Sequence, residues 1–318
     1  MFNRILLPLD RSPQAECVLP HAVAVARAFE SQVTLLGVLE TARGSRWRRS
    51  VDPLNWQIRK VEAKTYLHEL ELRLQLAGLA TETQILEGAA AEKVIEFSRH
   101  ANTQLIVLSS HGQSGVSEWG VSSVALKIAL RAHTSIMIVR AAQPTALEMT
   151  GLRYHRILVP VDGSQRAESI LPVAATFARA HDAQIVLAHI VQSPAMPRRT
   201  PPSREDVELA DRLVERNQAE ATQYLDQLQT RITGKVDSYV RVSDHLTATL
   251  HELVEQEKVD LVLLSAHGCS SQTRWLYGEV VSNFISYGTT PLLIMQDVSQ
   301  DRPIPAQAKM TGSEHGRQ

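Results

Sequence analysis

Short apolar runs alternate along the chain with longer amphipathic stretches. The first run, Ile5–Leu9, is uninterrupted and stops at Asp10, which is typical of a parallel strand buried on both faces. Ser12 and Pro13 then mark a helix start, and apolar residues at helical spacing predict a helix over Ala15–Phe29. Strands that alternate with helices indicate βαβ units, a parallel sheet and right-handed crossovers.

The alternation continues through both halves of the chain. In the first half it predicts strands at Val33–Leu39, Thr83–Leu86, Leu105–Leu108 and Ser135–Val139, and helices at Ile58–Leu76, Glu92–His100 and Ser122–Arg131. In the second half it predicts strands at Ile157–Val161, Ile185–Ile190, Ser238–Val242, Leu261–Leu264 and Leu292–Met295. One long helix there carries a stripe that only Asn217 interrupts, formed by Val207, Ala210, Val214, Asn217, Ala221, Tyr224, Leu228 and Ile232.

The two halves repeat each other. Arg4–Asp10 (RILLPLD) returns as Arg156–Asp162 (RILVPVD), and the segment from Leu105 to Gly112 returns as the segment from Leu261 to Gly268. A repeat of this length is a whole domain, because solenoid units have periods of about 20–50 residues. The predicted fold class is therefore α/β, with two repeated open parallel five-stranded sheets flanked by helices in a Rossmann-like arrangement. We expect domains at 1–140 and 154–297, a linker at 141–153 and a polar, disordered tail at 298–318.

Composition and charge narrow the class of protein. The 318 residues are 44% apolar and 21% charged, as in ordinary globular chains, and the formal net charge of -1 argues against a general nucleic-acid or membrane-surface binder. No apolar run approaches the roughly 20 residues that span a bilayer, and the start of the chain runs directly into the first strand, so we expect neither a membrane span nor a signal peptide. With only Cys17 and Cys269, the chain has no disulfide framework, and we expect a cytoplasmic protein.

Two motifs carry a family resemblance. Each half has an Asp that ends its first strand, and a His-Gly pair after its fourth strand, followed by a Trp-bearing loop and a helix. In these features both halves resemble the universal stress protein family, and two copies in one chain resemble its tandem members. The resemblance implies a sheet order of three-two-one-four-five, bound ATP with or without Mg²⁺, and pairing of the two fifth strands within the chain. Whether two chains then associate is left open.

The resemblance also implies the ligand-binding residues. Ligands of open parallel sheets bind beyond the carboxyl ends of the strands, where the strand order reverses. An Asp there accepts from a base or ribose, a Gly lets backbone N–H groups approach phosphate, and the backbone after the second strand meets the adenine edge. The implied positions are Pro8, Leu9, Asp10, Ser12, Val38, Ser109, Gly112, Gly115, Ser122 and Ser123 in the first half, and Val161, Asp162, Ser164, Ile190, Ser265, Gly268 and Gly278 in the second.

Both halves depart from the family motif, which reads Gly-x-x-Gly, nine residues, then Gly-Ser or Gly-Thr. In the first half both outer glycines are serines, Ser109 and Ser122, and Arg11 replaces the Gly of Asp-Gly-Ser. A serine costs little where φ is negative, and about 1–2 kcal/mol in a left-handed conformation. In the second half Glu279 replaces the hydroxyl residue, and its repulsion of phosphate is about 1–4 kcal/mol at 4 Å. We therefore expect the first half to be the better ATP site, with Arg11 as a further phosphate contact.

Alternative roles exist for several of these residues. Asp10 and Asp162 could simply cap the helices that follow them. His111 and His267 suit hydrogen-bonded turns better than a metal site, because neither has a second ligand at metal spacing. We expect Cys17 to be inert packing, Cys269 to be the candidate reactive thiol, Trp119 and Trp275 to pack, and the arginines at Arg46–Arg49 to be solvated.

Three functions follow from these residues. The favoured one is a cytoplasmic stress-response protein that binds adenine nucleotide without being an enzyme, since no general base, metal-carboxylate cluster or arginine finger is evident. The alternative is a degenerate tandem scaffold that works through its surface and has lost its nucleotide. A slow ATPase is the least favoured, because the Gly112–Gly115 segment lacks the spacing of a nucleophile elbow and Gly234-Lys235 lacks the rest of a Walker motif.

Overall fold

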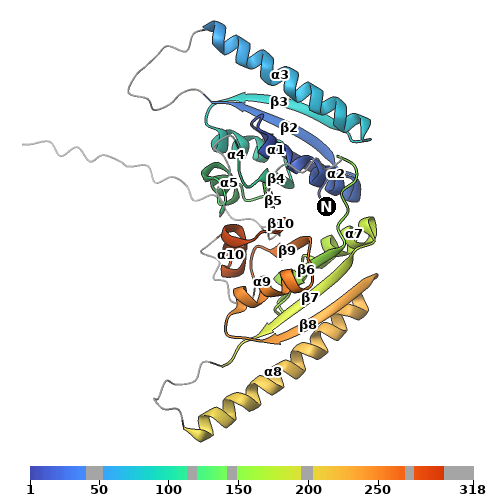
Figure 1. Cartoon of the computed structure of the whole chain (residues 1–318), viewed down its shortest axis with the longest axis vertical. Coiled ribbons are helices and arrows are strands. Elements are labelled where there is room, and N and C mark those ends of the chain that lie inside the picture. The colour runs from blue at the N-terminus through green and yellow to red at the C-terminus, as the bar shows by residue number, and fades with distance from the viewer. Residues whose placement is uncertain (41–52, 113–119, 142–148, 195–202, 269–275, 297–318) are drawn as a thin grey trace, which may run out of the picture.

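The computed structural model describes residues 1–40, 53–112, 120–141, 149–194, 203–268 and 276–296 (Figure 1). The two halves lie end to end, and the long helices α3 and α8 lie at opposite ends of the molecule. Among the described residues, no helix combines the length and the apolar character that crossing a membrane requires.

Each half has the same order of elements. The first half contains β1 (Arg4–Leu9), α1 (Pro13–Glu16), α2 (Val18–Phe29), β2 (Gln32–Leu39), α3 (Pro53–Leu76), β3 (Thr81–Glu87), α4 (Ala90–His100), β4 (Leu105–Ser109), α5 (Ser123–Ala129) and β5 (Ser135–Val139). The second half contains β6 (Arg156–Pro160), α6 (Gln165–Glu168), α7 (Leu171–His181), β7 (Gln184–Val191), α8 (Arg204–Arg231), β8 (Lys235–Val242), α9 (Leu246–Gln256), β9 (Leu261–Ser265), α10 (Glu279–Tyr287) and β10 (Leu292–Met295).

All these strands join in one ten-stranded sheet. Its order is β3-β2-β1-β4-β5-β10-β9-β6-β7-β8, so each half has the order three-two-one-four-five that the resemblance implies. Neighbouring strands within each half are parallel. At the centre β5 and β10 are antiparallel, with Met137 opposite Leu293. The predicted pairing of the fifth strands within one chain is confirmed, and the two five-stranded sheets meet there edge to edge.

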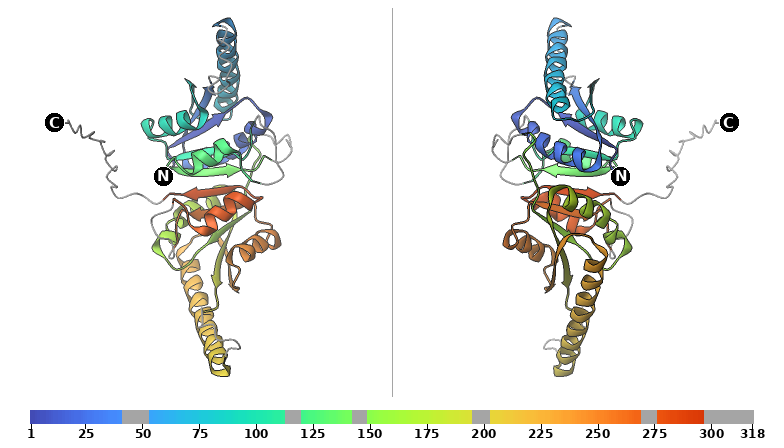
Figure 2. Two further views of the ribbon diagram at one scale, coloured as in Figure 1. Left: turned by 90° about the vertical axis from the view of Figure 1, so that its left-hand side faces the viewer. Right: turned by 90° about the vertical axis from the view of Figure 1, so that its right-hand side faces the viewer.

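Two hydrophobic cores lie on the two faces of this sheet. Ile5, Leu7 and Leu9 of β1 contribute to the core beneath α2, α3, α7 and α8, whereas Leu6 contributes to the core beneath α4, α5, α9 and α10 (Figure 2). Successive strand residues point to opposite faces, so a strand covered on both sides reads as a continuous apolar run. Each core contains residues of both halves, so the halves are packed as one body.

The helix predicted over Ala15–Phe29 is in fact two helices. α1 ends at Glu16, and α2 begins at Val18 after Cys17. Pro20 explains the break, because a proline lacks the N–H that would bond the carbonyl of Glu16 and its ring crowds that carbonyl. Pro172 has the same relation to α6 in the second half.

Other predicted elements differ from those of the structure by a few residues at their ends or in how much of them is buried. β3 and β8 begin earlier than predicted, at Thr81 and Lys235, and α5 is shorter, ending at Ala129. Of the apolar stripe predicted along α8, Ala221 and Leu228 are buried, together with Leu225 beside them, and Val207 is 44% exposed. The amino-terminal part of α8 therefore extends beyond the sheet (Figure 1).

Each half caps a helix of the other at the central seam. The Arg140 guanidinium, just after β5, donates to the carbonyls of Phe284 and Ile285 at the end of α10, at 2.6 and 3.1 Å. The Tyr277 hydroxyl donates to the carbonyl of Ala129 at the end of α5, at 2.8 Å. Burial lowers the pKa of Arg140 to about 10. These bonds supply donors to carbonyls in the last turns of α5 and α10, where Phe284 also accepts from the N–H of Gly288.

An aromatic cluster joins the halves on one face of the sheet. His21 of α2 lies 2.7 Å through Nδ1 from the Tyr154 hydroxyl, and the Tyr154 ring packs edge-on against Phe177 and His181 of α7. Burial lowers the pKa of His21 to about 4. Burial also lowers the pKa of His181, with Arg153 as a lesser cause. The folded protein therefore holds these histidines in the neutral form.

We predict that the protein loses stability as the pH falls from about 6.5 towards 4. The folded pKa of His21 lies below that of a free histidine, so the unfolded chain takes up a proton first, at a cost of roughly 3 kcal/mol for the full shift. Urea unfolding at several pH values measures this loss. His21→Gln should flatten the dependence, whereas His68→Gln, at an exposed position of α3, should leave it unchanged. An unchanged slope in His21→Gln would contradict the assignment.

Candidate functional site

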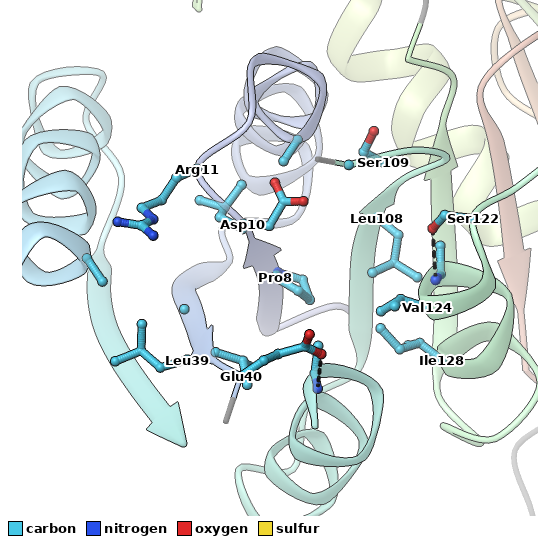
Figure 3. Close-up of a pocket in the computed structure, with 18 of the residues that line it drawn as sticks. Pro8, Asp10, Arg11, Leu39, Glu40, Leu108, Ser109, Ser122, Val124 and Ile128 are labelled. Atoms are coloured by element: carbon cyan, nitrogen blue, oxygen red, sulfur yellow. Dashed lines mark hydrogen bonds between the residues drawn. The ribbon is translucent and has the colours of Figure 1, made fainter. Parts of the chain in front are cut away.

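A cavity of about 390 Å³ opens in the first half at the carboxyl ends of β1, β2 and β4 (Figure 3). It lies where the strand order reverses, between β1 and β4, and α3 and α5 border it. Of the residues implied by the family motif, those that line it are Pro8, Leu9, Asp10, Val38, Ser109, Gly112, Ser122 and Ser123. The structure thus brings together segments that are more than 100 residues apart in the chain.

Asp10 fixes the turn that follows β1. Its Oδ1 accepts hydrogen bonds from the backbone N–H and the hydroxyl of Ser12, at 3.0 and 2.6 Å. The Ser12 hydroxyl in turn accepts from the N–H of Ala15 and caps α1. Ser12 is buried and is not among the residues that line the cavity. The same bonds, with the same lengths, link Asp162 to Ser164 in the second half. The capping role is therefore present in both halves, with the serine as cap and the aspartate as its support.

The aspartate occupies the space where a side chain of the glycine position after β4 would lie. A Cβ atom added to Gly112 would overlap Oδ2 of Asp10, and one added to Gly268 would overlap Oδ2 of Asp162. Neither glycine has the positive φ that would by itself demand a glycine. The recurring Asp and Gly are thus one steric unit, in which the carboxylate lies directly against the glycine backbone.

The serines at the outer glycine positions fit their places. Ser122 has φ -58° and is the N-cap of α5, because its hydroxyl accepts from the N–H of Ala125 at 3.2 Å. Gly278, its counterpart before α10, has no side chain with which to cap. The Ser109 hydroxyl donates to the carbonyl of Gln14 at 2.8 Å and so ties β4 to α1. Serine at position 122 therefore carries no backbone penalty and stabilises the helix.

Arg11 adopts a left-handed conformation with φ 68°, where the second half has Gly163 with φ 80°. This conformation costs a non-glycine residue about 1–2 kcal/mol. The Arg11 guanidinium is paired with Glu62 of α3 at 3.1 Å, and it points towards α3, away from Ser122 (Figure 3). In this arrangement Arg11 lies at the opposite end of the cavity from the serines proposed for phosphate.

The sequence did not single out several residues that line the cavity, including Glu40, Arg59, Tyr66 and Ala90. The Glu40 carboxylate accepts from the N–H of Ala90 at 3.1 Å and so caps α4, whose own N-cap residue is an alanine. Burial, with the nearby Glu16 carboxylate, raises the pKa of Tyr66. The sequence contains a signal for Tyr66 alone. When the two long helices are aligned, Tyr66 and Tyr224 occupy the same position.

The second half has a different cavity. It has a volume of about 430 Å³, and it is lined by Gly163 of the turn after β6 and by residues of β7 and α8 that include His189, Ile190, Asn217 and Tyr224. Of the second-half residues implied by the motif, Ile190 alone is among those that line this cavity.

The two crevices differ in at least two side chains. The position of Gly37, which lines the first cavity, is occupied by His189 in the second, and the His189 ring lies 6.0 Å from the Tyr224 ring. Glu279 is in the first turn of α10, where an acid stabilises the helix terminus.

The remaining candidates are placed as follows. His111 is buried with Nδ1 3.0 Å from the Ser110 hydroxyl, and burial lowers its pKa. Burial raises the pKa of the Cys17 thiol, which disfavours the reactive thiolate and suits the packing role expected for it. No group of three or more metal-ligating side chains is found within the described ranges. The candidates outside the described residues are Gly115, Trp119, Cys269, Trp275 and the basic segment with Arg46–Arg49.

Comparisons with known proteins agree on one family. The sequence model of the universal stress protein family matches residues 1–140 and 153–296. A universal stress protein of Mycolicibacterium smegmatis is 21% identical over 306 residues, which cover 92% of this chain and 96% of that protein. Universal stress protein MJ0531 of Methanocaldococcus jannaschii is 25% identical over 147 residues, which cover 44% of this chain and 83% of that protein.

Solved structures share the fold over nearly the whole chain. A universal stress protein from Archaeoglobus fulgidus superposes with a TM-score of 0.67 at 15% identity, covering 93% of this chain and 99% of that one. A putative universal stress protein from Pseudomonas aeruginosa gives a TM-score of 0.68 at 13% identity, with 93% of each chain covered. The paired arrangement of two domains is therefore found in known structures.

We predict that Gly112→Ala destabilises the protein by about 1–3 kcal/mol, because the added methyl group overlaps the Asp10 carboxylate. Chemical unfolding measures the loss. In an Asp10→Ala background the same substitution should cost much less, which a double-mutant cycle detects. Gly278→Ala is the matched control, since its Cβ would meet only the carbonyl of Ala266 at 3.8 Å. Equal costs of Gly112→Ala in both backgrounds would show that the contact does not matter.

Proposed function

Because this chain belongs to the universal stress protein family, with a family match in each half, we propose that it is a stress-response protein that binds adenine nucleotide in its first domain. The cavity between β1 and β4 carries this proposal. Its volume of about 390 Å³ falls within the 300–1,000 Å³ typical of small-molecule sites. Its place, where the strand order reverses, is where open parallel sheets bind nucleotides.

The chemistry of the lining supports a nucleotide. At one end Ser122 and Ser123 present hydroxyl groups that can donate to phosphate oxygens. Asp10 lies between the two ends, and a carboxylate has lone pairs enough to accept from a ribose hydroxyl as well as from Ser12. Apolar walls for a base come from Val38, Leu108 and other residues of the strands. Polar groups that orient a ligand within mostly apolar walls are typical of such sites.

We propose that the second domain binds nucleotide more weakly than the first, or does not bind it. Its cavity is lined by His189 where the first has Gly37, and neither Gly268 nor Gly278 lines it. Glu279 stands where Ser123 stands in the first domain, and a carboxylate near phosphate is repulsive. These differences support binding of about one nucleotide per chain.

We propose retention of nucleotide in the cytoplasm rather than turnover. The acidic side chains of the cavity already have structural tasks, since Asp10 holds Ser12 and Glu40 caps α4 through Ala90. A general base has to be available to the reacting water, so these tasks favour a protein that holds ATP, with or without Mg²⁺.

Calorimetric titration with ATP, in the presence and absence of Mg²⁺, tests this proposal. We expect about one site per chain in the wild type and at least tenfold weaker binding in Ser123→Glu, because the carboxylate repels phosphate by about 1–4 kcal/mol. Glu279→Ser is the matched control in the second domain and should leave the first site unchanged. Thermal unfolding without nucleotide checks that both variants are folded.

Each result that contradicts this proposal leads to a different conclusion. A wild type that ignores millimolar ATP would leave the tandem scaffold as the better function. Tight binding that Ser123→Glu leaves intact, and that substitution at Glu279 changes, would place the nucleotide in the second domain. Phosphate release above background in the titrated samples would favour the ATPase instead.

A further inference from the structure

Helix α3 has apolar residues on two opposite faces. Its inner face is buried against the sheet and consists of Ala63, Leu67, Leu70 and Leu74. Its outer face, which we call the outer stripe, consists of Leu54, Ile58, Val61, Thr65, Leu72 and Leu76. The apolar members of this stripe are between 45% and 88% exposed.

The spacing places these residues on one line along the helix. Leu54 and Leu72, like Ile58 and Leu76, are about five complete turns apart, so the members of each pair point in the same direction. Val61 and Thr65 lie between them on the same side. The stripe therefore runs along almost the whole of α3, whose position at one end of the molecule leaves its outer side away from the sheet (Figures 1 and 2).

The fold itself does not require this stripe. The equivalent helix of the second half, α8, aligns with α3 through Tyr224 and Tyr66 and through their buried neighbours. In that alignment the positions of the outer stripe are occupied by Arg212, Arg216, Ala219, Gln223 and Thr230 of α8 and by Gly234 just after its end. A helix can thus cover this end of the sheet with a polar outer face, and the apolar face of α3 needs another explanation.

The area of the stripe is large enough for an interface. Its apolar side chains expose on the order of 500 Å² in each copy, in two groups on either side of Thr65, and apolar patches of this size on a monomer are often functional. A symmetric pairing of two stripes would bury about 1,000 Å² in total, which is at the lower limit for a specific protein–protein interface. The interface would be modest, so we expect a dissociation constant in the micromolar range.

The stripe is also self-complementary. When two copies of α3 are placed antiparallel with Thr65 at the centre, Leu54 of one copy faces Leu76 of the other and Ile58 faces Leu72, whereas Val61 lies opposite Glu69. Each apolar pair is then made twice, as an isologous interface requires. We propose that α3 is the surface through which two copies of this chain associate, as an antiparallel helix pair about a two-fold axis at Thr65.

This dimer would leave the rest of the molecule unchanged. The β5 and β10 edges are already paired within the chain, so an edge-to-edge sheet dimer at that seam is not open to a second copy. The outer ends of the sheet, where α3 and α8 lie, are the parts that a second copy can reach (Figure 1). Among the described residues of these two helices, α3 carries exposed apolar residues along its length, whereas the exposed apolar residues of α8 are Val207 and Leu209 near its start.

Sedimentation velocity of the full chain, from about 1 to 200 µM, tests the proposal. We expect reversible dimerisation of the wild type and at least tenfold weaker association of Ile58→Glu, because the carboxylate would be placed against Leu72 of the partner copy. The matched control is Val207→Glu, which changes an exposed apolar residue of α8 and should leave the association unchanged. A wild type that stays monomeric, or a dimer that Ile58→Glu leaves intact, would overturn the proposal.

Cysteine cross-linking tests the orientation of the two helices. We expect Thr65→Cys to cross-link with itself, and a mixture of Ile58→Cys and Leu72→Cys chains to give a mixed cross-linked dimer. Ile58→Cys alone should not cross-link, because its partner in an antiparallel pair would be about 21 Å away along the helix. Self-linkage of Ile58→Cys would indicate a parallel pair and would contradict the two-fold axis at Thr65. Wild-type protein controls for linkage through the native cysteines.

Discussion

The antiparallel pairing of β5 with β10 is the contact on which the rest of the structure depends. It converts two open sheets into one, and it covers edges whose unpaired backbone groups would otherwise invite aggregation. Because the sheet is continuous, each hydrophobic core extends across the seam, and the Arg140 and Tyr277 bonds then fix helix ends of opposite halves. The first cavity is linked to this seam through α5, which lines the cavity and accepts the Tyr277 bond at Ala129.

A second constraint is local and occurs twice. The aspartate after the first strand of each half holds a serine N-cap with one oxygen and lies against a glycine backbone with the other. A ligand is therefore not needed to explain why Asp and Gly recur together. It is the surroundings of this unit that differ between the halves, with Gly37 and Ser123 in one, and His189 and Glu279 in the other.

The sequence predicted the fold well where a local pattern was enough. The run before Asp10 and its repeat before Asp162 predicted the strands, and the family resemblance supplied the strand order. The break before Pro20 was missed because helical spacing on either side of it looks continuous. The burial of α8 was overestimated at Val207, since periodicity shows which face is apolar but not how far the sheet extends. Glu40 and Tyr66 were missed because their place in the cavity depends on the packing of distant elements.

The contrast between the long helices shows which positions of a duplicated fold are free to diverge. The inner faces of α3 and α8 match, with Tyr66, Leu67 and Leu70 recurring as Tyr224, Leu225 and Leu228, because both pack on the same sheet. Their outer faces carry no packing constraint from the sheet, and there the two sequences differ. An apolar outer face costs solubility without stabilising the monomer, so its presence on one helix alone is most simply explained by association. The crevices follow the same rule. The fold fixes the Asp–Gly unit, which recurs in both halves, whereas it leaves the residues of the crevice walls free to differ.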